Sequence, residues 1–126
     1  MSPPASPDEA PIGLPRGYLR PCLLLLLAEG PSHGYDLLEQ MPRLGLERAD
    51  PGGLYRALRA MERGGLVASW WEHSTSGPAR RTYQLTDEGL DWLHLWAGSL
   101  REVHNHLGAY LARYAEVAAP VPTEER

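Results

Sequence analysis

Residues 50–65 read DPGGLYRALRAMERGG and have the start, the periodicity and the end of an amphipathic helix. Asp50 is a favourable N-cap residue and Pro51 suits the first helical position, while Gly64-Gly65 stops the helix after Arg63. The expected inward stripe recurs every three or four residues and consists of Leu54, Leu58 and Met61. The other faces carry Tyr55, Arg56, Arg59 and Arg63, so the sequence predicts an exposed arginine face.

Two strands are predicted after this helix, at Val67–His73 and Arg81–Thr86, because both segments are rich in valine, tryptophan, threonine and tyrosine. The cluster from Ser74 to Pro78 forms turns readily, so the strands should make a hairpin. Arg80 and Arg81 follow this turn, and adjacent guanidinium groups on a protruding loop suit phosphates or a minor groove.

Two further helices are predicted before residue 50, at Tyr18–Glu29 and His33–Leu44, separated by Gly30-Pro31. Ser32 is the expected N-cap of the second helix. Its expected buried face consists of Tyr35, Leu38 and Met41, with Leu37 as a further candidate. Three helices followed by a hairpin describe a winged helix-turn-helix, whose third helix enters the major groove of DNA. The alternative is that the arginines are only a solvated helix face.

A fourth, long helix is predicted to follow Thr86, an N-cap residue with Asp87 and Glu88 in the first turn. Its apolar residues alternate at spacings of three and four, the a/d pattern of a coiled coil, and the pattern predicts a homodimer. They are Leu93, Trp96, Leu100, Val103, Leu107, Tyr110 and Tyr114. The predicted organisation is a Pro-rich arm (1–15), a DNA-binding domain (16–86), a dimerisation helix (87–117) and a tail (118–126).

The composition favours a small cytoplasmic protein that is not an enzyme. The chain has 126 residues, a net charge of −4 and one cysteine, Cys22, which is expected to be a core thiol. No apolar stretch is long enough to span a bilayer. The charge is uneven, because the arginines outnumber the acids only between Arg16 and Arg81. Nucleophile–base pairs, phosphate-binding loops and carboxylate clusters are lacking in the sequence, so no cofactor and no metal is expected.

Several motifs resemble the PadR family of bacterial transcriptional regulators. They are HGYDLL (33–38), GLYRALR (53–59), Glu62, GLV (65–67) and GPARRTYQLTDEG (77–89), followed by the long helix. The resemblance implies a homodimeric winged-helix repressor of a double-stranded DNA operator, with the last helix making the dimer contacts. A winged-helix protein–protein adaptor that does not bind DNA is the alternative.

The resemblance also assigns roles to individual residues. Tyr55 matches the recognition-helix tyrosine that meets a phosphate or the groove, and a core aromatic residue is the alternative. Arg56 and Arg59 match base- and backbone-facing positions, and Gly53 opens the same motif. Arg81 matches the basic residue of the wing and Arg80 extends it. Trp71 matches a packing tryptophan of the wing, whereas Trp70 has no counterpart.

A small hydrophobic or aromatic effector is a further hypothesis. Leu100 lies where multidrug-binding relatives carry a ligand-stacking tryptophan, so that role does not carry over directly. Trp92 and Trp96 could still flank a cavity at the dimer axis together with Leu100, and ordinary aromatic packing at the seam is the alternative.

Overall fold

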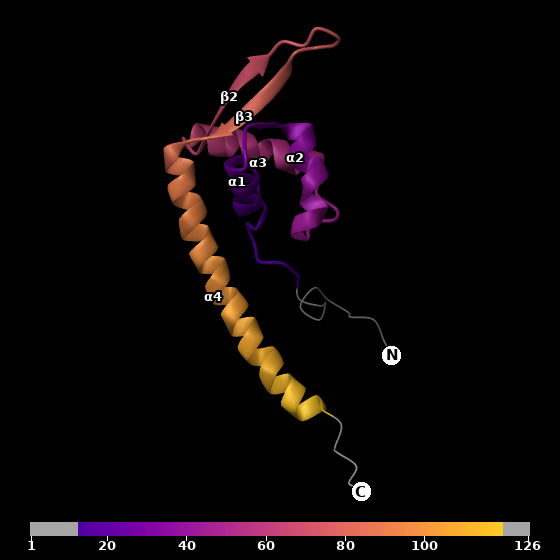
Figure 1. Cartoon of the computed structure of the whole chain (residues 1–126), viewed down its shortest axis with the longest axis vertical. Coiled ribbons are helices and arrows are strands. Elements are labelled where there is room, and N and C mark those ends of the chain that lie inside the picture. The colour runs from indigo at the N-terminus through magenta and orange to yellow at the C-terminus, as the bar shows by residue number, and fades with distance from the viewer. Residues whose placement is uncertain (1–12, 120–126) are drawn as a thin grey trace, which may run out of the picture.

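The computed structural model describes residues 13–119 and is mostly helical, with one small antiparallel sheet (Figure 1). In chain order the elements are α1 (Leu19–Ala28), β1 (Ser32–His33), α2 (Gly34–Gln40), the 3₁₀ helix η2 (Met41–Leu44), α3 (Pro51–Arg63), β2 (Val67–Glu72), β3 (Arg80–Leu85) and α4 (Asp87–Ala118). The predicted winged helix-turn-helix with a long C-terminal helix is confirmed. Most of the predicted arm (1–15) and tail (118–126) lies outside the described residues.

The hydrophobic core lies between α1, α2 and α3, and Val67 and Tyr83 of the sheet complete it. Its largest fully buried side chains are Leu23, Leu24, Leu37, Met41, Leu54, Leu58 and Met61. Removing a leucine or methionine side chain of this size from water contributes about 1.5–3 kcal/mol to stability. The inward stripe predicted for α3 is therefore confirmed, and it fixes which face of α3 remains in solvent.

The segment before α2 differs from the prediction, because Ser32 does not cap the helix. Ser32 and His33 form the short strand β1, in which Ser32 pairs with Tyr83 and His33 pairs with Thr82. The N-cap of α2 is His33, whose side chain makes no capping hydrogen bond. The edge of β3 supplies backbone partners to this extended segment, so the predicted hairpin is part of a three-stranded sheet in the order β1-β3-β2.

The buried face of α2 also differs, because Tyr35 is 64% exposed. The inward positions are Gly34, Leu37 and Met41, at spacings of three and four residues. Leu37 and Met41 are buried as predicted, and Leu38 is partly buried against the core. Gly34 is buried because the ring of Tyr55 packs against its backbone. The single helix predicted for His33–Leu44 is divided into α2 and η2, since Pro42 has no N–H group to continue the α-helical hydrogen bonds.

The start of α4 is fastened to the turn that follows α3. The Thr86 Oγ1 atom accepts the N–H of Gly89 at 3.0 Å, as predicted for the N-cap. The same hydroxyl group donates its hydrogen to the carbonyl oxygen of Gly65 at 2.7 Å. Gly89 is buried, and a Cβ atom there would overlap the carbonyl oxygen of Leu66. The direction in which α4 leaves the domain is therefore set by packed backbone.

The two halves of α4 have different surroundings. The first half packs against α1, whereas every residue from Arg101 to Ala119 is exposed. Figure 1 shows the second half extending away from the other elements. A helix of 32 residues is about 48 Å long, so much of it reaches beyond the domain.

Candidate nucleic-acid interface

The exposed side of α3 carries the arginines that the sequence placed there. Because Leu54, Leu58 and Met61 are buried, Arg56, Arg59 and Arg63 remain exposed along the same helix. Arg59 and Arg63 make no ion pair within residues 13–119. Their guanidinium groups are therefore available to an anion from outside the chain.

The N-terminus of α3 combines a helix cap with an ion pair. The Asp50 Oδ2 atom accepts the N–H of Gly53 at 3.0 Å and lies 3.6 Å from Nη2 of Arg56. Both side chains of this pair are about 70% exposed, at 71% for Asp50 and 70% for Arg56. Such a pair contributes roughly 0–1 kcal/mol, so Arg56 can leave it at little cost. Gly53 is placed here as part of the cap.

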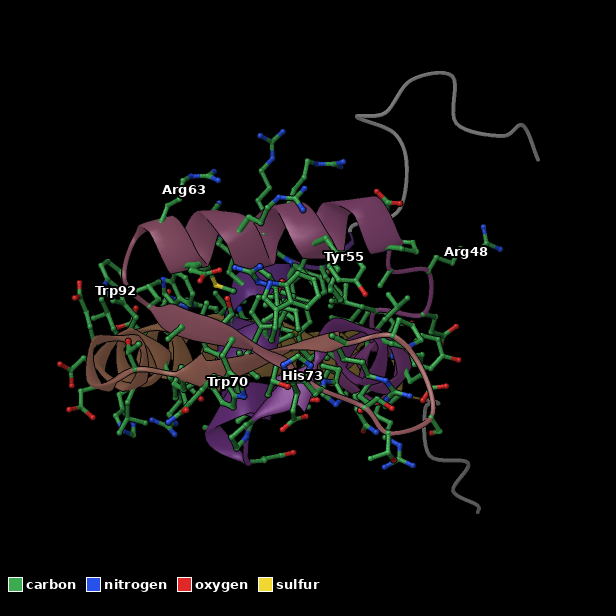
Figure 2. All side chains as sticks on the ribbon, turned by 90° about the horizontal axis from the view of Figure 1, so that it is seen from above. Arg48, Tyr55, Arg63, Trp70, His73 and Trp92 are labelled. Atoms are coloured by element: carbon green, nitrogen blue, oxygen red, sulfur yellow. The ribbon has the colours of Figure 1, made fainter. Side chains whose placement is uncertain are left out.

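A cleft of about 540 Å³ separates α3 from the wing formed by β2 and β3. Its lining combines cationic and aromatic side chains with one acid: Tyr55, Arg59, Glu62, Arg63, Trp71, Arg81 and Tyr83. Figure 2 shows Tyr55 between α3 and the strands. The cleft brings Tyr55 and Arg59 of α3 together with Arg81 of the wing, three of the predicted site residues.

Arg81 is held in place by neighbours from both sides of the cleft. Its Nε atom donates to Ser69 Oγ at 2.9 Å, and its Nη2 atom lies 3.7 Å from Glu62 Oε1. Its guanidinium carbon lies 5.3 Å from the ring centroid of Trp71, within the range of a cation–π contact. Ser69 was not among the predicted site residues, and Glu62 appeared only as part of a motif.

Arg80 lies on the other face of the wing, since neighbouring residues of a strand point to opposite faces. It is exposed and forms no ion pair with any residue of the described chain. Trp70 lies on this same face, because it pairs with Thr82 across the strands (Figure 2). The structure thus places the two adjacent wing arginines on opposite faces of the wing.

A polar cluster ties β1 to this second face of the wing. The Thr82 hydroxyl donates to Glu72 Oε1 at 3.2 Å, and His33 Nδ1 lies 3.2 Å from Thr82 Oγ1. His33 Nε2 is 3.6 Å from the same Glu72 oxygen. The cluster satisfies the buried hydroxyl of Thr82, so His33 has a structural part in the wing.

The predicted dimerisation residues fall into two groups along α4. Leu93, Trp96 and Leu100 are half-buried against their own domain. The remaining four are exposed, from 38% for Val103 to 68% for Tyr110, and include Leu107 and Tyr114. An isolated chain thus leaves an apolar stripe in water over the second half of α4.

The predicted effector residues lie near a hollow between α1 and α4. A groove of about 450 Å³ is lined by Trp96, Leu100 and Val103 on one side and by residues 15–18, 20 and 21 on the other. The ring of Trp92 lies 5.6 Å from that of Trp96, centroid to centroid, at an angle of 54°. Trp96 and Leu100 thus share a groove, while Trp92 supports the ring of Trp96.

The titratable groups of the core show the effect of burial. Desolvation raises the pKa of the Cys22 thiol, and the neighbouring Tyr18 side chain opposes that shift. Burial also raises the pKa of Tyr83, against the opposing charge of Arg81. Within residues 13–119, no three His, Cys, Asp or Glu side chains are grouped closely enough to hold a metal ion. None of the helices in this range is long and apolar enough to span a membrane.

The fold and the arginine-bearing helix beside a wing define a winged-helix DNA-binding fold of the kind found in transcription regulators. Residues 23–94 match the family model described as the transcriptional regulator PadR-like family. This match covers more than half of the sequence, so the chain belongs to the PadR-like family of transcriptional regulators.

Solved structures of PadR regulators have the same fold. A PadR family regulator from Clostridium difficile is 29% identical, with a TM-score of 0.67 over 75% of this chain and 99% of that chain. A PadR-like regulator from Bacillus cereus is 27% identical, with a TM-score of 0.68 over 76% and 93%. A PadR family regulator from Eggerthella lenta is 32% identical, with a TM-score of 0.65 over 76% and 83%. No curated protein matches the sequence significantly.

Proposed function

We propose that this protein is a sequence-specific repressor that binds an inverted-repeat DNA operator as a homodimer. The observation that carries the proposal is the exposed arginine face of α3 beside a cationic and aromatic cleft under the wing. A face of this kind suits a polyanion, because guanidinium groups bind phosphates and guanine edges in a bidentate manner. The net charge of −4 does not oppose this, since the arginines outnumber the acids between Arg16 and Arg81, the segment that contains α3 and the wing.

The proposed contacts divide between reading bases and gripping the backbone. Arg56 and Arg59 project from the recognition helix toward the major groove, and Tyr55 and Gly53 lie where the helix meets the sugar–phosphate chain. Arg81 faces the same cleft, whereas Arg80 extends from the outer face of the wing toward the flanking DNA. Chromosomal DNA is then the partner, and the cytoplasm is the place of action.

The exposed stripe on α4 supports the homodimer. Leu107, Tyr110 and Tyr114 continue the spacing of Leu93, Trp96 and Leu100, and a second copy of the helix would cover them. A two-fold dimer presents its recognition helices to two successive major grooves, so the half-sites would lie about 34 Å apart.

An effector would act through α4. The groove beside Trp96 and Leu100 is also lined by Arg16 and Arg20. The ring of a small aromatic ligand would pack against the Trp96 ring and the guanidinium groups, which supports a ligand of this class. Because α4 sets the distance between the two domains of the dimer, a ligand between α1 and α4 would change the spacing of the recognition helices.

DNA binding is tested by fluorescence anisotropy with two labelled duplexes, one from upstream of the protein's own gene and one scrambled, each at two salt concentrations. Tight, salt-sensitive binding to the first duplex alone is the expected result. Equal weak binding to both would mean that the operator lies elsewhere. Absence of binding at low salt would contradict the proposal and favour a protein–protein adaptor.

A further inference from the structure

Glu62 is an acid placed inside the cationic cleft, where it links α3 to both strands of the wing. Its Oε2 atom accepts the hydroxyl hydrogen of Ser69 at 2.7 Å, and its Oε1 atom lies 3.7 Å from Nη2 of Arg81. Ser69 belongs to β2 and Arg81 to β3, so one carboxylate of α3 engages both wing strands.

The Ser69 hydroxyl gives this cluster a direction. A hydroxyl group has one hydrogen to donate, and here that hydrogen goes to Glu62. The oxygen of Ser69 is then oriented to accept the Nε–H of Arg81, at 2.9 Å. The carboxylate therefore orients the serine, and the serine orients the guanidinium group.

The Arg81 guanidinium group is held on several sides but keeps donors for a ligand. Ser69 takes one of its five N–H groups, Glu62 lies opposite another, and the ring of Trp71 supports its face. The side chain is still 40% exposed. The remaining N–H groups can meet a phosphate oxygen without a further search among side-chain rotamers.

We propose that Glu62 is a positioning residue for DNA binding, which acts through Ser69 to hold Arg81 ready for a backbone phosphate. This inference rests on the proposed DNA-binding function. Electrostatics alone gives the opposite expectation, since a carboxylate beside a phosphate repels it. The two explanations therefore predict opposite signs for the loss of the carboxylate charge.

The test measures binding of the full-length protein to the two duplexes described above. Glu62→Gln and Ser69→Ala should each weaken binding to DNA about three- to tenfold, the cost of immobilising one long side chain on binding. Ser69→Ala changes no charge, so its effect cannot come from altered repulsion. Glu72→Gln is the matched control, because it removes an acid from the same wing without touching the Arg81 side chain, and its binding should be unchanged or tighter.

Glu62→Gln in an Arg81→Ala background separates the positioning of Arg81 from general damage to the fold. Without Arg81 there is nothing to position, so Glu62→Gln should no longer weaken binding and should tighten it by removing a repulsive charge. Weakening of equal size in both backgrounds would overturn the inference, as would tighter binding of Glu62→Gln in the otherwise wild-type protein.

Thermal unfolding of each variant shows whether it is folded at the temperature of the binding assay. If the Glu62→Gln protein is unfolded at that temperature, the Ser69→Ala variant provides the test. Wild-type affinity for DNA in a folded Ser69→Ala protein would overturn the inference. Failure of the wild-type protein to bind either duplex at low salt would overturn the proposed function, and this inference with it.

Discussion

The aromatic ring of Tyr55 in α3 lies directly against the backbone of Gly34, the first residue of α2. A Cβ atom at Gly34 would overlap Cε1 of the ring and would lie 2.8 Å from its Cζ atom. Gly34 is buried, while Tyr55 remains partly exposed in the cleft beside the wing. The absence of a side chain at Gly34 therefore leaves the space that the Tyr55 ring of α3 occupies.

Replacing Gly34 with alanine should lower the free energy of unfolding by about 1–3 kcal/mol, because the added methyl group overpacks the contact with Tyr55. Urea denaturation followed by circular dichroism measures the change. Gly108→Ala is the control, since a Cβ atom there meets nothing within 4 Å and an exposed helical glycine gains roughly 0.5–1 kcal/mol on becoming alanine. Similar changes in both variants would contradict the contact described for Gly34.

In a Tyr55→Ala background, Gly34→Ala should lower the free energy of unfolding by much less than it does in the wild-type protein, because the methyl group then has room. Recovery in the double variant would identify Tyr55 as the obstructing group. If the two costs simply add, the obstruction lies elsewhere.

Alanine at Arg56 or Arg59 should relax the preference for the operator over the scrambled duplex by about 1–3 kcal/mol, because each substitution removes one of the proposed contacts to base edges. Arg81→Ala should instead weaken binding to both duplexes alike. It should also reduce the slope of log affinity against log salt by about 0.9, the value for one phosphate contact. Anisotropy titrations at several salt concentrations measure both quantities, and equal losses of preference in all three variants would refute this division.

The helices whose N-termini are marked by a capping residue could be predicted from the sequence. Asp50 and Thr86 both cap their helices as expected, and each side chain accepts the backbone N–H of the residue three positions further on. The alternating apolar positions of α3 likewise follow from the helical period alone, so Leu54, Leu58 and Met61 are buried as predicted.

The features that depend on distant partners could not be predicted in this way. The strand β1 exists because an edge of β3, some fifty residues later, is available to Ser32 and His33. Tyr35 was expected in the core because its spacing fits, but Tyr55 from the next helix occupies the space beside Gly34. The link from Glu62 through Ser69 to Arg81 needs the register of β2 against β3, which spacing alone does not give.

The buried thiol of Cys22 should make the protein less stable as the solution becomes alkaline. Its pKa is raised in the folded state by burial, so the unfolded chain loses this proton first, at about pH 8.5. The stabilisation is fully present below that pH and is lost as the pH rises through the folded-state pKa. Urea denaturation between pH 7 and pH 10 should show this fall, and Cys22→Ala should show a shallower one.

Tyr18 and Tyr83 also have raised pKa values through burial, so some decline should remain in Cys22→Ala at the upper end of this range. Tyrosines ionise at higher pH than thiols, at about pH 10 when exposed. Identical pH profiles for the wild-type and Cys22→Ala proteins would show that the thiol does not contribute.

Aspartate at both Leu100 and Leu107 should prevent the proposed dimer from forming. Both residues occupy the same position of the apolar repeat on α4, and a dimer would bury them opposite their counterparts. Two uncompensated carboxylates per helix would then be removed from water, which costs several kcal/mol for each ion. Sedimentation velocity should show the mass of one chain for the double variant and of two chains for the wild-type protein.

Asn105→Asp supplies the matched control, because it adds an acid between the same two positions but away from the apolar stripe. It should remain dimeric at the same protein concentration. The monomeric double variant should also lose most of its affinity for the operator, since two linked recognition helices bind far more tightly than one. A double variant that still sediments as a dimer would place the subunit contact away from this stripe of α4, and the proposed spacing of the half-sites would lose its support.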